Sequence, residues 1–335
     1  MKSQFFIICC VAVAFGVVSS VPFRERELFW YPTDKGTVVP AFLKGGPAST
    51  QAVEDDVEFW HYLAGEKNGR LVEPDCQGCT AAFVRGAPLV VLAHGFGSDH
   101  VGGFGNNHRN GFETRGEPVN LVFVNWSKLA QAPWYETAAN NVKPVGEYSA
   151  KLINFLVAQG VATLDNTFFV GHSLGSHVAN YVTLNTVGGK IRGVFALDPA
   201  LPLFGVKEDN ERIDPEDGQF VNVIHTSMGT LLDGGLAFTE PRGHVDFYPN
   251  SGKDQPGCPG FDFGACSHSR SYGYLGESIG RPSAFPACKC DNWEDYDAGR
   301  CTCLDQAPMG WDTPRTTRGV YYLRTNANSP YGQGS

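Results

Sequence analysis

Short apolar runs rich in β-branched residues alternate with helical patterns through the middle of the chain. The expected strands are residues 89–92, 119–124, 168–170, 191–197 and 220–224. Apolar runs of this length are typical of strands buried on both faces of a parallel sheet. Between the second and third runs, one helical stripe is formed by Val145, Tyr148, Leu152, Phe155 and Leu156, and Gly160 ends the helix. The pattern predicts an α/β fold, with a mostly parallel central sheet flanked by helices and right-handed crossovers.

The N-terminal pattern differs from the rest. Lys2 precedes an apolar run over residues 5–18, and two small serines follow it. This arrangement is typical of a cleaved secretory signal, here residues 1–20, and the run is too short to span a bilayer. Export and an even number of remaining cysteines favour disulfides.

The C-terminal part, from about residue 282, is dense in Cys, Pro and acidic residues. We expect disulfide-stapled loops there, followed by a final strand in the segment VYYLRTN. No linker or internal repeat divides the chain, so residues 21–335 are expected to form one domain. The formal net charge is −9 and Lys and Arg form no runs, which disfavours nucleic acid as a partner.

The stretch FFVGHSLGSH carries the most specific chemistry. It places Ser173 between an apolar strand pattern and a helical pattern, with Gly171 and Gly175 two residues to either side. Glycines at these positions remove the side chains that would collide in a tight strand-to-helix turn. The pattern predicts that Ser173 is a nucleophile in a strained turn that pushes its hydroxyl out over the edge of the sheet.

A serine nucleophile needs a histidine to take its proton and a carboxylate to orient that histidine. Asp198 ends an apolar strand one βα unit after Ser173, at the sheet edge where sites of α/β folds gather. Among several histidines, His268 is the favoured base, because it lies late in the chain on a loop anchored by the Cys258 to Cys266 clip. The competing candidates are His172, His177, His225 and His244.

The tetrahedral intermediate of such a reaction needs N–H donors for its oxyanion. The N–H of Leu174 directly follows the nucleophile. The N–H of Phe96, on the loop after the strand at 89–92, is the second expected donor.

These segments together resemble the pancreatic-type (neutral) lipase family. The likeness runs from about residue 85 to 275 through HGF (94–96), GHSLGSH (171–177), LDPALPLF (197–204), VIHT (223–226), GHVDFYPN (243–250) and PGC…ACSHSRSY (256–272). It implies an α/β-hydrolase fold, a triad of Ser173, Asp198 and His268, and oxyanion donors at Phe96 and Leu174. It also implies hydrolysis of glycerolipid acyl esters at a lipid–water interface.

Two departures from the family pattern refine the expected activity. Only seven residues separate Cys258 from Cys266, where triacylglycerol lipases of the family carry a longer lid. A short lid favours substrates with bulky polar heads, so we expect a lipase with phospholipase A1 activity. The loop at 226–242 is not short, which keeps a strict triacylglycerol lipase as the alternative. About 65 residues follow His268, so we expect neither the family's C-terminal β-sandwich nor a colipase partner.

A different class of function also uses this scaffold, namely a catalytically silent lipid-binding or storage protein of the yolk-protein type. Such relatives lose the nucleophile. Because every triad position is filled here, the enzyme is favoured.

No cofactor is expected to be required, but DNERIDPEDGQF resembles the structural calcium loop of the family. The resemblance implies carboxylate ligands from Asp214 and Asp217 and carbonyl ligands from Asp209 and Arg212; the alternative is a solvated acidic turn. Among the cysteines, Cys258 is expected to pair with Cys266 and Cys76 with Cys79. Further on, Cys290 is expected to pair with Cys301 and Cys288 with Cys303, although the swapped pattern remains open.

Overall fold

The computed structural model describes residues 28–33, 37–48, 53–229, 235–260 and 262–334. The expected signal at 1–20 lies outside the described residues. Among those that are described, no helix is both long and apolar enough to cross a bilayer.

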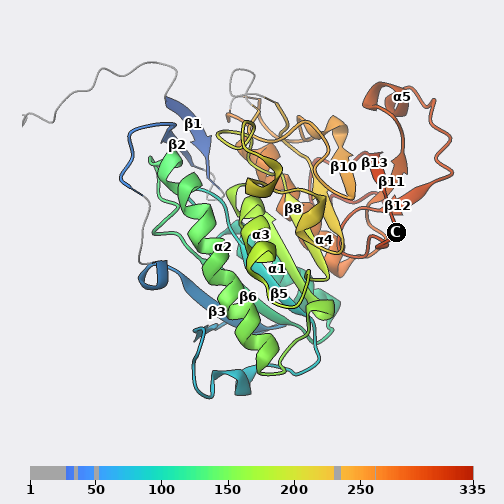
Figure 1. Ribbon diagram of the computed structural model, residues 1–335. Coiled ribbons are helices and arrows are strands. Elements are labelled where there is room, and N and C mark those ends of the chain that lie inside the picture. The colour runs from blue at the N-terminus through green and yellow to red at the C-terminus, as the bar shows by residue number, and fades with distance from the viewer. Residues whose placement is uncertain (1–27, 34–36, 49–52, 230–234, 261, 335) are drawn as a thin grey trace, which may run out of the picture.

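An eleven-stranded sheet organises the molecule (Figure 1). Its strands, in order across the sheet, are β12 (Gln306–Pro308), β11 (Pro286–Lys289), β13 (Gly319–Leu323), β10 (Val245–Pro249), β9 (Val221–Ile224), β8 (Gly193–Leu197), β7 (Thr167–His172), β5 (Leu89–Ala93), β6 (Asn120–Asn125), β3 (Glu58–Leu63) and β4 (Arg70–Val72). Every neighbouring pair from β13 to β6 is parallel, and the pairs outside that range are antiparallel. The predicted mostly parallel sheet is therefore confirmed.

The five strands expected from the apolar runs are β5 to β9, each with bounds within two residues of the prediction. The helix expected between β6 and β7 is α2 (Tyr135–Ala158), which begins ten residues before Val145, the first residue of the predicted stripe. Its stripe continues upstream through the buried Tyr135 and Ala138. Gly160, in a left-handed conformation with φ of 64°, follows its end.

Helices cover both faces of the sheet. Helix α2 packs with α3 (Leu174–Asn185) on one face, and α1 (Gly103–Arg115) packs with α4 (Ala265–Gly280) on the other. Alternating residues of one strand therefore enter different cores: Leu89 and Val91 of β5 join the cluster beneath α2 and α3, whereas Val90 and Leu92 join the cluster beneath α1 and α4. Both faces are dry, which explains the continuous apolar runs.

The C-terminal region contains more regular secondary structure than the predicted loops. It contributes β11 and β12 to the sheet and a short helix, α5 (Trp293–Asp297). Its disulfides are nested, Cys288 with Cys303 outside and Cys290 with Cys301 inside.

A separate two-stranded antiparallel sheet lies at the N-terminal end of the described chain. It consists of β1 (Leu28–Pro32) and β2 (Val38–Phe42), and Leu28 pairs with Phe42. Neither strand hydrogen-bonds to the main sheet. We refer to this unit as the N-terminal hairpin.

Candidate active site

Ser173 occupies the sharp turn between β7 and α3. Its backbone is held at φ 57° and ψ −121°, a conformation that a non-glycine residue adopts at a cost of about 1 to 3 kcal/mol. A Cβ on Gly171 would lie 2.2 Å from the carbonyl oxygen of Gly175, and one on Gly175 would lie 2.2 Å from that of Ala93. Both glycines are therefore required by contact with neighbouring backbone. This is the strained strand-to-helix turn that the sequence predicts.

Asp198 follows β8 directly, also with a positive φ, 48°. Its carboxylate is fully buried, and three donors besides the histidine orient it. The N–H groups of Thr226 and Ser227 donate to Oδ1 at 2.6 and 3.0 Å, and the Ser227 hydroxyl donates to Oδ2 at 2.5 Å. Three hydrogen bonds to one carboxylate fix its direction.

His268 reaches the carboxylate from α4. Its Nδ1 lies 2.6 Å from Asp198 Oδ2, and its main-chain N–H donates to the carbonyl of Gly264. The histidine therefore lies in the first turn of a helix, and the prediction that it lies on a loop is wrong. Gly264, whose φ is 79°, turns the chain into that helix. The segment before the helix is rich in glycine and has no apolar stripe.

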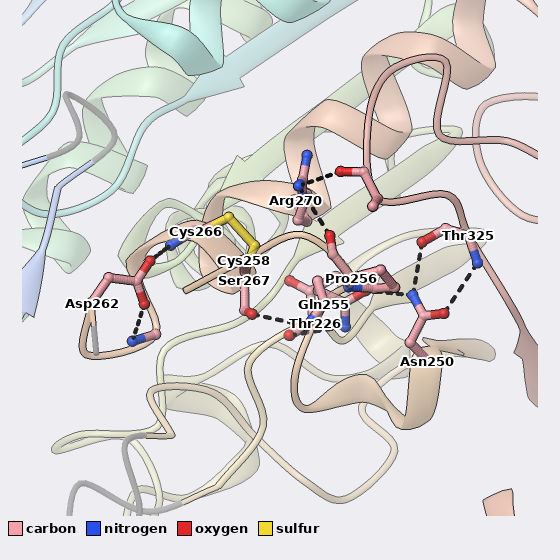
Figure 2. Close-up of a disulfide and its surroundings, with 12 residues drawn as sticks. Thr226, Asn250, Gln255, Pro256, Cys258, Asp262, Cys266, Ser267, Arg270 and Thr325 are labelled. Atoms are coloured by element: carbon pink, nitrogen blue, oxygen red, sulfur yellow. Dashed lines mark hydrogen bonds between the residues drawn. A yellow bond between two sulfur atoms is a disulfide. The ribbon is translucent and has the colours of Figure 1, made fainter. Parts of the chain in front are cut away.

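The helix start is held by the clip that the sequence singles out (Figure 2). A disulfide joins Cys258 to Cys266, two residues before His268. Within the clip, the Asp262 carboxylate accepts the N–H groups of Gly264 and Cys266 at 3.1 and 2.9 Å. These bonds satisfy main-chain donors at the start of α4, as capping residues do.

A second set of bonds links the first turn of α4 to Thr226 (Figure 2). The main-chain N–H of Gln255 donates to the Ser267 hydroxyl at 3.0 Å, and its side-chain amide donates to the carbonyls of Thr226 and Pro249. Thr226 is also a donor to Asp198. The residue before the base and a residue that holds the acid are thus joined through one buried glutamine.

The loop after β5 lies against the nucleophile. A Cβ on Gly95 would lie 2.8 Å from the Cβ of Ser173, so only glycine permits this approach. The loop is fixed by Trp126, whose indole N–H donates to the carbonyl of His94 at 2.9 Å. Phe96, which carries one of the two expected oxyanion donors, follows Gly95, and Leu174, which carries the other, begins α3, whose first N–H groups have no partners within the helix. Oxyanion binding by these two groups stays a prediction.

The competing histidines all have structural contacts. His172, His177, His225 and His244 engage, respectively, the carbonyls of His268 and Ala200, the carboxylate of Asp246 and the N–H of Val221. Burial lowers the pKa of His172 well below its ordinary value and that of His177 to about 3, so neither ring carries a charge at neutral pH. These contacts account for them without a catalytic role.

The expected calcium loop follows β8. The Asp217 carboxylate accepts the N–H of Asp214 at 3.0 Å and the side-chain amide of Asn180 at 3.0 Å. Desolvation by burial raises the pKa of Asp217 well above its ordinary value, and that of Asp214 also rises. A bound cation would offset the desolvation of these two buried carboxylates. The side chains of Asp209 and Arg212 pair with each other, so that only their carbonyls would be ligands.

Within the described ranges, no group of three or more His, Cys, Asp or Glu side chains is arranged to hold a metal ion. Two of the four expected calcium ligands are carbonyls and would not form such a group. Calcium binding stays a prediction.

Two residues at the site have no signal in the sequence. Ser227 donates to Asp198, and it follows the VIHT segment whose chemistry gives no reason to single it out. Tyr31, on β1, places its hydroxyl 2.5 Å from Ser173 Oγ and 3.0 Å from His268 Nε2. The serine and the histidine thus come together with a tyrosine hydroxyl between them.

A serine on a strained strand-to-helix turn, with a histidine and an aspartate gathered at the carboxyl ends of parallel strands, defines an α/β hydrolase. The family model described as Lipase matches residues 64–331, and the chain belongs to this family.

Individual relatives agree with this assignment. The chain is 38% identical over 196 residues to lipase member H-A of Xenopus laevis, covering 57% of this chain and 41% of that protein. It is 35% identical over 245 residues to pancreatic triacylglycerol lipase of Equus caballus, covering 65% of this chain and 52% of that protein. The matched part thus spans about half or less of these relatives.

Among solved structures, a sugar hydrolase from Lactococcus lactis is 14% identical, over 43% of this chain and 64% of its own, with a TM-score of 0.31.

Proposed function

We propose that the protein is a secreted serine esterase that hydrolyses acyl esters of glycerolipids. The observation that carries the proposal is the convergence of Ser173, His268 and Asp198 at one edge of the sheet, with the aspartate 2.6 Å from the ring. Membership of the Lipase family supports a lipid substrate. Four disulfides support an oxidising compartment outside the cell.

Each group has one role in the reaction. Ser173 Oγ attacks the ester carbonyl, and its proton passes to His268 Nε2 as the new C–O bond forms. The oxyanion is stabilised by the N–H groups of Phe96 and Leu174. The carbonyl then reforms, the old C–O bond breaks, and His268 returns the proton to the leaving alcohol. Water, activated by the same histidine, hydrolyses the acyl-enzyme, while Asp198 holds the ring.

The substrate class is proposed from the clip. Helix α4 begins at Ala265, inside the clip, and Asp262 accepts N–H groups at the start of that helix, so the clip has little length left to cover an acyl groove. Phe263 on the clip is 52% exposed. Without a long lid, the entrance admits bulky polar head groups, which supports phospholipase A1 activity beside triacylglycerol hydrolysis. The name of the horse relative supports the alternative, a strict triacylglycerol lipase.

A fluorophosphonate probe and two lipids test the proposal. We expect the probe to label Ser173, and Ser173→Ala to abolish labelling and hydrolysis. The matched control is Ser176→Ala, one helical turn further on, which should keep both. We also expect turnover of phosphatidylcholine vesicles as well as emulsified triolein. Turnover of triolein alone would refute the phospholipase part, and hydrolysis that is unchanged in Ser173→Ala would refute the mechanism.

A further inference from the structure

The N-terminal hairpin closes the catalytic groups off from solvent. Ser173 is 0% exposed and His268 is 2% exposed. The Tyr31 hydroxyl is within hydrogen-bonding distance of both Ser173 Oγ and His268 Nε2. It therefore occupies the path along which the serine proton must travel, and no carbonyl carbon can approach Ser173 Oγ while it is there.

The hairpin also fills the apolar surface beside the nucleophile. The Tyr31 ring packs edge-on against Phe96 at 5.1 Å between centroids, and Phe29 packs edge-on against Tyr135 at 5.2 Å. Thr33, just after β1, lies against Gly97, which follows Phe96 on the loop after β5. A Cβ on Gly97 would be 2.8 Å from the methyl group of Thr33. The hairpin thus covers both the nucleophile and the loop expected to bind the oxyanion, in the manner of a bound acyl group.

This unit contacts the rest of the molecule through side-chain packing and through a main-chain hydrogen bond, in which the Phe42 N–H donates to the Pro133 carbonyl at 2.7 Å. It forms a sheet of its own, and a two-stranded sheet alone in water is marginally stable at best. It can therefore leave without breaking any pair of strands in the main sheet. The hairpin stays in place because its covalent link to the rest of the chain keeps its effective concentration at the active site high.

The linking segment is open to proteases. Residues 43–48, after β2, form neither helix nor strand, and Lys44 and Gly45 are exposed. Proteolysis favours such irregular, exposed segments. Lys44 also provides the basic side chain that one large class of proteases recognises.

We propose that the N-terminal hairpin is an intramolecular plug of the active site, and that cleavage of the bond between Lys44 and Gly45 activates the enzyme. Water adds across this bond, leaving a carboxylate on Lys44 and an ammonium on Gly45. The inference rests on the proposed hydrolytic function, because a plug needs a site to block.

The new N-terminus has a partner already in place. The Gly45 N–H donates to the Glu136 carboxylate at 3.0 Å, in the first turn of α2. After cleavage the same nitrogen carries a positive charge, so this contact becomes an ion pair. The cleaved body therefore keeps its new end anchored while the hairpin, cut on the other side, is released.

The test compares the intact full chain with the same preparation after limited trypsin treatment, with the new N-terminus identified by mass spectrometry. We expect cleavage after Lys44 to raise kcat/KM for 4-nitrophenyl butyrate and the rate of fluorophosphonate labelling about 100-fold, as for a site that is open about 1% of the time before cleavage. Lys44→Gln should resist both the cut and the activation.

Variants separate a plug from a catalytic tyrosine. Tyr31→Ala should activate the intact chain, and Tyr31→Phe should activate it less, because the ring remains. The control is Trp30→Ala, on the opposite face of β1 and 48% exposed, which should leave the intact rate unchanged. Equal rates in intact and cleaved chains, or lower rates in both Tyr31 variants, would overturn the plug.

Hydrogen exchange gives a reading that needs no catalysis. Cleavage should increase amide exchange at residues 94–97 and 173–176, and should separate the hairpin peptide from the body on size exclusion. Unchanged exchange would overturn the plug. Release and faster exchange without labelling in any form would instead overturn the proposed function.

Discussion

His268 Nδ1 lies 2.6 Å from Asp198 Oδ2, although 70 residues separate the two in the chain. The N–H groups of Thr226 and Ser227 fix the carboxylate independently of the ring, so the aspartate orients the histidine and not the reverse. A substitution of Asp198 itself is therefore expected to lower activity more than the loss of one of its donors.

Asp198→Asn is expected to lower kcat by about 10³- to 10⁴-fold, because the amide supports the wrong tautomer of His268. Ser227→Ala removes one of four donors to the carboxylate and should cost about tenfold, with a shift in the pH profile of kcat/KM. Ser227 is a positioning residue, because its hydroxyl donates to Asp198 and lies 3.3 Å from His268 Nδ1. Steady-state kinetics over pH 5 to 9 measure both. Equal losses in the two variants would contradict the roles assigned here.

The Cys258–Cys266 disulfide is expected to matter for both stability and turnover. Replacing both cysteines by serine opens a nine-residue ring and should lower the free energy of unfolding by about 2 to 3 kcal/mol by loop entropy. It should also lower kcat, since His268 lies in the first turn of the helix whose start the clip holds. Denaturant unfolding and kinetics check this.

The matched control is the same change at Cys76 and Cys79, whose bridge lies outside the active site. This variant should lose stability but keep kcat. If the Cys258 and Cys266 variant keeps full kcat, the clip serves only as a structural staple.

His108, fully buried in α1, should make the protein less stable in acid. Desolvation lowers the pKa of His108 to about 4, whereas the unfolded chain binds this proton near pH 6.5. The unfolded state therefore holds more protons between these values, and stability is lost as pH falls through this window. The loss from this group is about 3 kcal/mol between pH 7 and 4.

His108→Leu should flatten the dependence of unfolding free energy on pH, as measured by urea titrations from pH 4 to 7. His244→Gln, at a half-buried ring, should flatten it less. An identical slope in wild type and His108→Leu would contradict the prediction.

Calcium is expected to stabilise the loop around Asp214 and Asp217. A cation there offsets the charge of two desolvated carboxylates, and at one hundred times its dissociation constant it would add about 2.7 kcal/mol. Thermal unfolding in calcium against a chelator measures the effect. Asp217→Asn should remove it, whereas Glu216→Gln, at an exposed side chain paired with Lys190, should not. The same Tm with and without chelator would refute calcium binding.

The sequence predicts those site residues whose positions are set by the residues next to them in the chain. Ser173 is found because a strand, two glycines and a helix surround it within ten residues, and Asp198 because a buried strand ends there. The helical setting of His268 is missed, because the helix begins through a capping aspartate and a disulfide and not through an apolar stripe. Tyr31 is missed for another reason: it meets Ser173 across 142 residues, and no local pattern predicts such a contact. Strands β11 and β12 are missed because they are short and lie among cysteines and prolines.

The order of the main sheet has a consequence for how copies of the protein behave at high concentration. The strands at its two ends, β4 and β12, are three residues long each, and the disulfide between Cys288 and Cys303 ties β11 to the loop just before β12. Unpaired N–H and C=O groups on an edge strand are what allow sheets of different molecules to join. With such short edge strands, the main sheet presents little template for edge-to-edge aggregation.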